Sequence, residues 1–474
     1  MEVGIGDLVV LHVDTTSEME VGTADAAQTT RDIGVQSNGA ETKTTRDMGV
    51  QCNISCTSCT KKEKDLDEKH VKELLLEKGC SAVQIKQMFN SGEGIKRYPD
   101  YTDEEICRGL VIRSLGEKTF CYLRNLQIFP LPSQTTLKRW ISGFKVTPGL
   151  NQQLFKLLET FLQTKEERSR YAAVAFDEME VKQVIEYDKA SKCVRGPHKK
   201  IQVVMIRGLI AKWKQVIYFS FDTPMRKDLL LDLIKKCEAA GAKVQGVVFD
   251  LGNHGFLKEF QILSDGQNRI QNPVDQNRDI FFFADAPHML KLLRNHLLDK
   301  GFTLTSKGSS VNLTKGDFEQ LLLLNGNELK LVPKLSHSHV DVKGIGRQRV
   351  RPAAQLLSDS VAKAFTYHFG ESYTIRSSFV KLINDWFDIM NSRSVNDVCP
   401  TKNAFGLKIE SQLNILNSMD NAMETLRFSN QQAKITKLPF QKGIQISIRS
   451  LIGLFQQLQK LDTGIKFVMT VRLN

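Results

Sequence analysis

The chain has 474 residues and a mass of 53.6 kDa, enough for roughly three domains of about 150 residues each. It contains no run of about 18 consecutive apolar residues, and its acidic N-terminus lacks a basic segment followed by an apolar core. The sequence therefore predicts neither a membrane span nor a secretory signal. Nine cysteines in 474 residues are too few for a disulfide scaffold, which favours a reducing compartment.

The charge is distributed unevenly along the chain. Residues 1–60 carry 3 basic and 9 acidic side chains, so the totals of 65 and 53 leave 62 and 44 for residues 61–474, a net charge of +18. A basic body of this kind favours a polyanionic partner, and we place nucleic acid slightly ahead of the alternative that the charge only serves solubility.

Residues 1–60 are predicted to form a disordered acidic tail with a short internal duplication, TTRDIGVQSN and TTRDMGVQCN. Cys52, Cys56 and Cys59 follow, with His70 and Cys80 further on. Such a cluster suits zinc, but a second ligand pair at a firm interval is missing, so an incidental cluster is the favoured interpretation.

Residues 61–97 are predicted to form a helical or coiled-coil segment, because apolar residues recur there at helical spacing. Ordinary core packing is the default for such a segment, although it also suits a homo-oligomer. Residues 98–170 are predicted to form a region that binds double-stranded DNA. Three short helical patterns lie within 98–145, the last of which carries Lys138 and Arg139, and another amphipathic helix follows over 151–168. This pattern suits a helix-turn-helix unit whose last helix enters the DNA major groove. A small helical bundle with a basic face explains the pattern equally well.

The period of the sequence changes at residue 171, and we expect a sheet domain over 171–287. The fold class predicted for the whole chain is mixed α and α/β, with a helical N-terminal region followed by a ribonuclease-H-like core. The order of elements is antiparallel strands first, then helix, strand, helix and strand. The expected strands are Tyr171–Phe176, Val181–Tyr187, Ile201–Leu209, Gln215–Phe221, Val244–Phe249 and Ile280–Ala284, with a helix from about Lys227 to Ala240.

Two acids end apolar strands in this core. Asp177 follows the first strand and Asp250 follows the strand after the first helix. In this topology those strands are neighbours, so the two carboxylates would lie close enough to share Mg²⁺ or Mn²⁺ ions for phosphodiester chemistry. An aspartate after a strand is often only a turn residue, which is the alternative for either acid alone. His288 follows Asp285 at another strand-to-helix turn, where a phosphate site and a structural cap are both compatible with the sequence.

Several segments resemble P-element-type DNA transposases, the family often associated with THAP domains. YTDEEICRGLVIRSLGEKTFCYLRNLQIFPLPSQTTLKRW resembles their helix-turn-helix region, and FDEMEV, VVFDLGNHG and FFADAPHMLKLLRNHLL resemble their ribonuclease-H-like core. RQRVRPAAQLLSDSVAKAF, NDWFDIMNSRS and LPFQKGIQISIRSL resemble the GTP-binding insertion that interrupts this core and the return from it. The resemblance runs from about residue 98 to the last residue.

The resemblance implies a mostly helical GTP-binding insertion over 288–446 and a return toward the core over 447–474. It also implies a DNA transposase, or a domesticated or decayed remnant of one, that acts in the nucleus and binds GTP. The guanine base would fall on Asp388, with Phe387 beside the ring. The sequence has no GxxxxGK[ST] loop and no Asn-Lys-x-Asp motif, so GTP binding rests on the resemblance alone.

Two departures from the family pattern modify this expectation. Residues 1–60 do not show the layout of a zinc-binding THAP domain. The third catalytic acid of the family is a glutamate on the closing helix of the core, and the chain reads only to Leu473-Asn474. We therefore expect incomplete catalysis and a partly uncovered face of the sheet. The alternative is a non-catalytic nuclear protein, derived from a transposase, that binds DNA or GTP.

Overall fold

The computed structural model describes residues 62–77, 85, 101, 103–125, 131–142, 147–188, 192–252, 254–306, 308–326, 330–428 and 437–474. The chain divides into two compact units, and the boundary lies between Phe144 and Lys145. The predicted acidic tail lies outside the described residues. So do Cys52, Cys56, Cys59 and Cys80, and the favoured interpretation of an incidental cluster stays a prediction.

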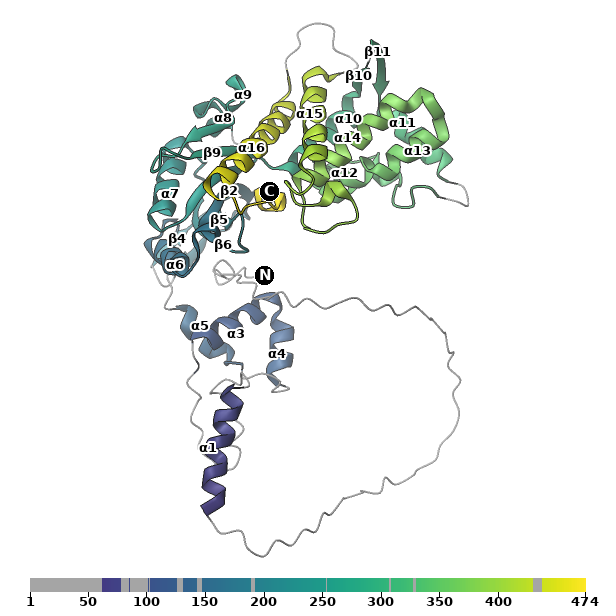
Figure 1. Cartoon of the computed structure of the whole chain (residues 1–474). Helices are drawn as coiled ribbons and strands as arrows, with labels where there is room; N and C mark the ends of the chain where they lie inside the picture. Colours follow the sequence, from purple (N-terminus) through teal and green to yellow (C-terminus); the bar gives the residue numbers. More distant parts are fainter. Residues whose placement is uncertain are drawn as a thin grey trace, which may run out of the picture. The chain divides into compact units, whose positions relative to one another are not determined.

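The N-terminal unit is helical, as the sequence predicts (Figure 1). Its helices are α1 (Lys62–Glu77), α3 (Asp103–Leu115), α4 (Glu117–Asn125) and α5 (Gln134–Ser142). Gly116 alone separates α3 from α4. The last three helices share a small apolar core formed by Ile106, Phe120, Leu131 and Leu137. This core makes the three-helix region a compact folding element.

The second unit is built on a seven-stranded mixed sheet in the order β1-β6-β5-β2-β7-β9-β8. Strands β2, β5 and β6 are antiparallel neighbours, whereas β7 pairs parallel with β2 and β9 pairs parallel with β7. This is the predicted ribonuclease-H-like order. The strands are β1 (Gly149–Leu150), β2 (Tyr171–Glu180), β5 (Lys200–Gly208), β6 (Lys214–Phe221), β7 (Lys243–Phe249), β8 (Arg269–Gln271) and β9 (Asp279–Ala284).

One predicted strand is wrong. Residues 181–185 form no strand, and the chain leaves the main sheet after Glu180. The following β3 (Glu186–Asp188) pairs only with β4 (Cys193–Arg195), in a separate two-stranded ribbon. The β-branched and aromatic residues of this stretch therefore pair locally, where a sequence pattern cannot tell a sheet strand from a hairpin strand.

Helices cover the sheet. They are α6 (Gln152–Gln163), α7 (Lys227–Ala239), α8 (His254–Glu259), α9 (Ile262–Asp265), α10 (Ala286–Lys300) and α16 (Pro439–Leu461). Helix α6 buries Leu154, Leu158 and Leu162, and the last two belong to the core of the sheet unit. The predicted DNA-binding region 98–170 is therefore divided by the structure, because the apolar face of α6 packs on the sheet unit.

The segment between α10 and α16 is mostly helical, as predicted. It contains α11 (Lys315–Leu324), α12 (Val350–Leu356), α13 (Asp359–Phe369), α14 (Thr374–Met390) and α15 (Ile409–Thr425), with a small sheet of β10 (Phe302–Ser306), β11 (Ser309–Leu313) and β12 (Arg427–Phe428). The return to the core begins at Pro439 and not at residue 447, because α16 is one continuous helix. Within the described residues, no helix is both long and apolar enough for a bilayer.

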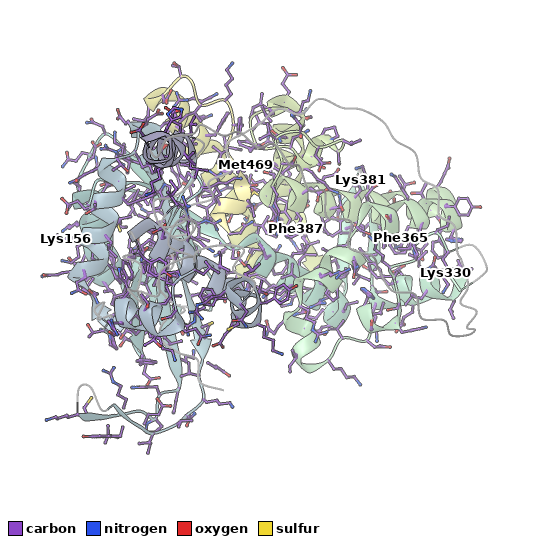
Figure 2. All side chains as sticks on the ribbon, turned by 90° about the horizontal axis from the view of Figure 1, so that it is seen from below. Lys156, Lys330, Phe365, Lys381, Phe387 and Met469 are labelled. Atoms are coloured by element: carbon purple, nitrogen blue, oxygen red, sulfur yellow. The ribbon has the colours of Figure 1, made fainter. Side chains whose placement is uncertain are left out.

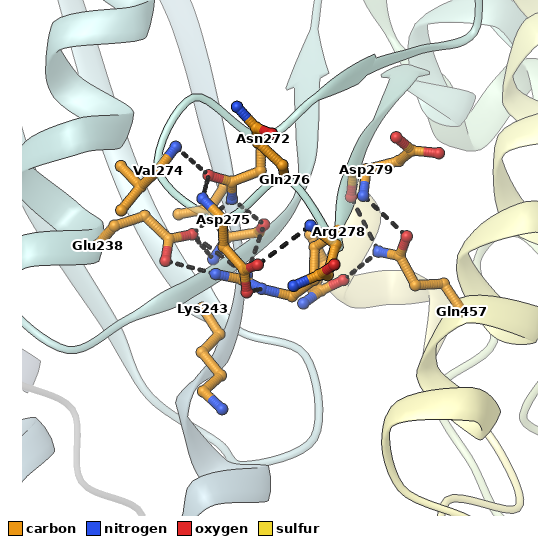
Figure 3. Close-up of polar contacts among 12 residues, drawn as sticks. Glu238, Lys243, Asn272, Val274, Asp275, Gln276, Arg278, Asp279 and Gln457 are labelled. Atoms are coloured by element: carbon orange, nitrogen blue, oxygen red, sulfur yellow. Dashed lines mark hydrogen bonds and ion pairs between the residues drawn. The ribbon is translucent and has the colours of Figure 1, made fainter.

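Helix α16 docks on β9 through small side chains. The backbone of Gly453 lies so close to Phe281 that a Cβ at residue 453 would be 2.5 Å from its ring. The Ser447 hydroxyl accepts from the Ala284 amide at 2.9 Å and donates to the Ala284 carbonyl at 3.1 Å. One turn before the helix ends, Gln457 accepts from the Asp279 amide and donates to its carbonyl (Figure 3). These contacts fix the register of the returning helix against the strand.

A buried ion pair holds the residue before β9, Arg278, against the end of α7. Arg278 donates two hydrogen bonds to Glu238 at 2.7 and 3.2 Å, and both side chains are about 95% buried. Glu238 also accepts a hydrogen bond from the backbone amide of Val244 and one from the side-chain amide of Asn272, both at 2.8 Å (Figure 3). The end of α7, the start of β7 and the loop before β9 therefore share one satisfied polar network.

The expected uncovered face of the sheet is wrong for β7, for β9 and for the first half of β2. The apolar residues of β7 and β9 are buried, as are Ala172, Ala173 and Val174 of β2. Half-buried apolar residues remain on β5, at Ile201, Val203 and Met205, and on β6, at Val216 and Phe221. Helix α16 supplies the cover that was expected to be missing.

We predict that Gly453→Ala destabilises the core by about 1–3 kcal/mol, because the added methyl group overpacks a buried ring. The matched control is Gly316→Ala, also in a helix, where the nearest atom to a new Cβ is 3.6 Å away. The control should be neutral or stabilising. Thermal unfolding of both variants checks this, and equal melting temperatures would contradict the close packing of α16 on β9.

Candidate functional site

The sheet brings three aspartates to the carboxyl ends of its parallel strands. In the β2–β7 register the last pair is Ala175 with Val248, and Asp177 and Asp250 each lie two residues further on. In the β7–β9 register Phe249 pairs with Ala284, so Asp250 and Asp285 are the next residues of neighbouring strands. Asp177 does not end its strand as expected, because β2 continues to Glu180 alongside β5.

The neighbouring aromatic residues direct the carboxylates to one face. Phe176 and Phe249 both pack against Phe256 of α8, with ring centroids 5.0 and 5.3 Å away. Successive side chains of a strand point to opposite faces. Asp177 therefore points away from α8, to the face on which Val203 of β5 is its paired neighbour.

Asp285 is the most buried acid of the three. Burial raises its pKa from 3.8 to about 6, and the charges of Asp250 and Asp177 act in the same direction. Its side chain caps α10 by accepting from the His288 amide at 2.9 Å. The cap turns the His288 ring toward the site, where Nε2 lies 3.2 Å from Oδ1 of Asp250. Burial lowers the pKa of His288, against the opposing effect of Asp250.

The donor set at this edge fits a hard divalent cation. The groups are carboxylate oxygens, and among the described residues no lysine or arginine forms an ion pair with Asp177 or Asp250. Asp177 is exposed and Asp250 is half-buried, so both are open to solvent. Within the described part of the chain, however, no group of three or more His, Cys, Asp or Glu side chains is arranged to hold a metal ion.

The sequence places Asp285 at the end of a strand and offers it, with Glu178 and Glu180, as an acid that could fill the third place of the site, without assigning it to the predicted pair. The sequence feature that points to Asp285 is the third occurrence of one pattern, an apolar strand followed directly by aspartate. His288 was weighed between a phosphate contact and a structural cap. The structure shows its backbone amide in the cap and its ring against Asp250.

A second candidate site is a cavity of about 490 Å³ in the insertion. Phe387, labelled in Figure 2, and Asp388 both line it, from the end of α14. Two cationic residues, Lys334 and Arg351, and two serines, Ser358 and Ser360, also line it. The other lining residues are Leu290, Val332, Pro333, Ala354, Gln355, Leu357 and Asn384.

Asp388 sits in a polar but sheltered corner of this cavity. Burial raises its pKa, and Oδ2 accepts from Asn384 at 3.2 Å and from Thr401 at 3.4 Å. An aromatic ring beside a carboxylate suits a flat base that carries adjacent N–H donors, and the two cations suit phosphates. The residues present therefore fit a guanine nucleotide.

Lys138 and Arg139 lie in the N-terminal unit, next to each other on α5. Both are exposed, whereas Leu137 beside them is fully buried in the three-helix core. Trp140 follows them and is 44% exposed. The core of this unit therefore presents the two predicted DNA-binding residues to solvent.

Family models match two parts of the chain. Residues 146–259 match "TNP-like, RNase H N-terminal domain", and residues 287–403 match "TNP-like, GTP-binding insertion domain". A solved structure of the Drosophila P element transposase strand transfer complex is similar at a TM-score of 0.71 and 32% identity, covering 86% of this chain and 90% of that chain. The chain belongs to the P element transposase family. Its core is ribonuclease-H-like, interrupted by the family's helical GTP-binding insertion domain.

Two curated relatives agree with this assignment. The transposable element P transposase of Drosophila melanogaster is 32% identical over 408 residues, which covers 84% of this chain and 52% of the relative. The DNA transposase THAP9 of Homo sapiens is 24% identical over 314 residues, 59% of this chain and 34% of the relative. The chain thus spans about half of the first relative and a third of the second.

We predict that, in metal-free buffer, Asp285→Asn stabilises the protein at pH 7.5 but not near pH 4. Burial favours the neutral carboxyl, so the wild type loses stability as the pH rises from about 4 to 6, by at most about 3 kcal/mol. Asparagine keeps an oxygen to cap α10 and does not ionise. Chemical denaturation at both pH values measures the difference, and an equal effect of the substitution at the two pH values would contradict it.

Proposed function

We propose that this protein is a DNA transposase core that cleaves and joins DNA strands at Asp177 and Asp250. The observation that carries the proposal is the placement of these two carboxylates. Each lies two residues beyond the last registered pair of the parallel strands β2 and β7, and no lysine or arginine among the described residues forms an ion pair with either. A solved relative is described as a strand transfer complex, which supports the same chemistry.

Asp177 and Asp250 would hold Mg²⁺ or Mn²⁺, and His288 would orient the Asp250 carboxylate through Oδ1. Bound divalent ions activate an attacking oxygen and stabilise a leaving oxygen. The protein's own contribution to this chemistry is to hold the two carboxylates on one face of the sheet. The buried aromatic cluster on the other face keeps water away from that side of the strands.

We predict that Asp177→Asn and Asp250→Asn each weaken Mn²⁺ binding at least about tenfold, because each removes an anionic ligand. Asp232→Asn on α7 is the matched control and should bind as the wild type does. Titration calorimetry of the full chain with MnCl₂ measures the affinities. Unchanged affinity in both site variants would rule out this metal site.

A second function is binding of DNA and GTP without cleavage. One observation favours it, namely that no three-residue metal cluster occurs among the described residues. A strand-cleavage assay of the 474-residue chain with Mg²⁺ or Mn²⁺ separates the two functions. Cleavage that disappears in Asp177→Asn would support the transposase and exclude the non-catalytic alternative.

We also propose that GTP occupies the cavity of the insertion, with the guanine at Phe387 and Asp388. A carboxylate accepts hydrogen bonds from guanine N1–H and the exocyclic amine, whereas adenine offers no matching pair of donors. Lys334 and Arg351 would bind the phosphates, since both line the same cavity.

We predict that Asp388→Asn lowers GTP affinity by about 10- to 100-fold, which corresponds to the loss of a charge-assisted hydrogen-bond pair. The variant should gain affinity for xanthosine triphosphate, whose base presents an acceptor in place of the amine. Asp341→Asn is the control, because Asp341 lies in the same insertion, is exposed, pairs with Lys315 and does not line the cavity. Fluorescent nucleotide titrations check both variants. An Asp388→Asn variant with wild-type GTP affinity would remove the guanine site from this cavity.

The three-helix region is proposed to bind duplex DNA through Lys138 and Arg139, and the protein is proposed to act in the nucleus. Exposure of both side chains on one helix supports phosphate contact. The basic excess of residues 61–474 supports a polyanionic partner for the whole chain.

We predict that Lys138→Ala with Arg139→Ala weakens duplex binding and reduces the slope of log K against log salt by about 1.8, since each phosphate contact contributes about 0.9. Lys118→Ala with Arg124→Ala on α4 removes the same charge and serves as the control. Fluorescence anisotropy at several salt concentrations gives both slopes. Identical slopes for the two double variants would mean that Lys138 and Arg139 of α5 contribute no more to phosphate binding than Lys118 and Arg124 of α4 do.

A further inference from the structure

The ribbon of β3 and β4 has no counterpart in the functions proposed so far. It lies in the chain between β2 and β5, which pair with each other in the main sheet, and its two strands form a sheet of their own. Figure 2 shows a two-stranded ribbon, in the blue of this part of the chain, projecting from the body at the lower left. A lone two-stranded ribbon is marginally stable in water, so an exposed one suggests a partner.

The two faces of the ribbon differ. Tyr187 pairs with Val194 across the strands, and these side chains are 60% and 65% exposed. Ile185, two residues before Tyr187, is 64% exposed. The intervening pair is Glu186 with Arg195, on the opposite face. One face is therefore aromatic and aliphatic, and it lies open to solvent.

The base of the ribbon is held firmly. Asp222 accepts from the amides of Lys199 and Lys200, both at 2.9 Å, and from His198 at 3.0 Å. The His198 ring stacks on Phe221, with centroids 4.3 Å apart. Gly196 is packed so closely on the Val184 carbonyl that a Cβ there would lie 2.3 Å away. The exposed apolar face of the ribbon is therefore attached to a base that is held by these contacts.

The segment is also basic. Residues 181–200 contain six lysines and arginines and two acidic residues. Lys182, Lys192 and Lys199 are exposed. Basic side chains around an open aromatic residue form the usual combination for nucleic acid, with phosphates bound by charge and bases by stacking. A second copy of this chain would bring a second net charge of +4 to the same place, so a polyanion is the favoured occupant.

The position of the ribbon points to the DNA at the carboxylate site. Strand β2 carries Asp177 and ends at Glu180, and the ribbon follows it in the chain, with β3 beginning at Glu186, nine residues after Asp177. We propose that the β3–β4 ribbon contacts DNA beside the phosphate undergoing reaction. Lys182 and Lys192 bind the backbone, and Tyr187 with Val194 packs on an exposed base. This inference rests on the proposed transposase function and adds a DNA-binding element to it.

The test uses the full chain in EDTA and a duplex with a short 3′ single-stranded end that contains 2-aminopurine. Stacking on Tyr187 should quench the fluorescence when the wild type binds. Tyr187→Ala should lose most of the quenching and bind about 5- to 100-fold more weakly. Tyr187→Trp should retain the quenching. Tyr367→Ala is the matched control, because Tyr367 is 75% exposed on α13, outside the sheet domain.

The charge is tested separately. Lys182→Ala with Lys192→Ala should reduce the salt slope of DNA binding by about 1.4 to 1.8. Lys212→Ala with Lys214→Ala removes equal charge at the β5–β6 turn, next to the start of β2, and should have a smaller effect. Circular dichroism confirms that each variant is folded.

Three results overturn the inference. Tyr187→Ala with wild-type quenching and affinity excludes stacking. Loss of self-association in Tyr187→Ala, with unchanged DNA binding, identifies the ribbon as an interface between copies. Both results leave the proposed function intact. A wild-type chain that binds no DNA overturns the proposed function together with this inference.

Discussion

The parallel pairing of β2 with β7 and of β7 with β9 is the constraint on which the candidate active site depends. It places Asp177, within β2, at the same edge of the sheet as Asp250 and Asp285, which directly follow β7 and β9, although the three are far apart in the sequence. Placing an acid at this edge costs free energy, because burial first, and the nearby charges of Asp250 and Asp177 to a smaller extent, raise the pKa of Asp285. The packing of the rest of the core keeps the strands in register despite this free-energy cost.

Helix α10 joins the two candidate sites. It begins at Asp285, directs His288 to Asp250, and one turn into the helix Leu290 lines the nucleotide cavity. Helix α16 then closes the core on β9 after the long insertion, and Gly453 and Ser447 permit the close approach. A nucleotide in the cavity and a metal ion at the carboxylates would therefore be linked by one rigid helix.

The strand–aspartate pattern and the order of elements were sufficient to predict the sheet topology and the location of Asp177 and Asp250. Sequence reasoning failed where the outcome depends on partners distant in the chain. Residues 181–187 read as a sheet strand, yet they lack a neighbour in the main sheet and begin a separate ribbon. Helix α6 read as part of the DNA-binding region, yet its leucines pack on the sheet unit. The cover given by α16 was missed because close helix packing depends on small residues such as Gly453, which carry no hydrophobic signal.

The most direct test of the account is to locate bound manganese by anomalous X-ray scattering from crystals of the full chain soaked in MnCl₂. The account predicts an anomalous peak at the carboxyl ends of β2 and β7, within about 2.5 Å of oxygens from both Asp177 and Asp250. A peak at another place only, or carboxylates of Asp177 and Asp250 on opposite faces of the sheet, would contradict the proposed active site.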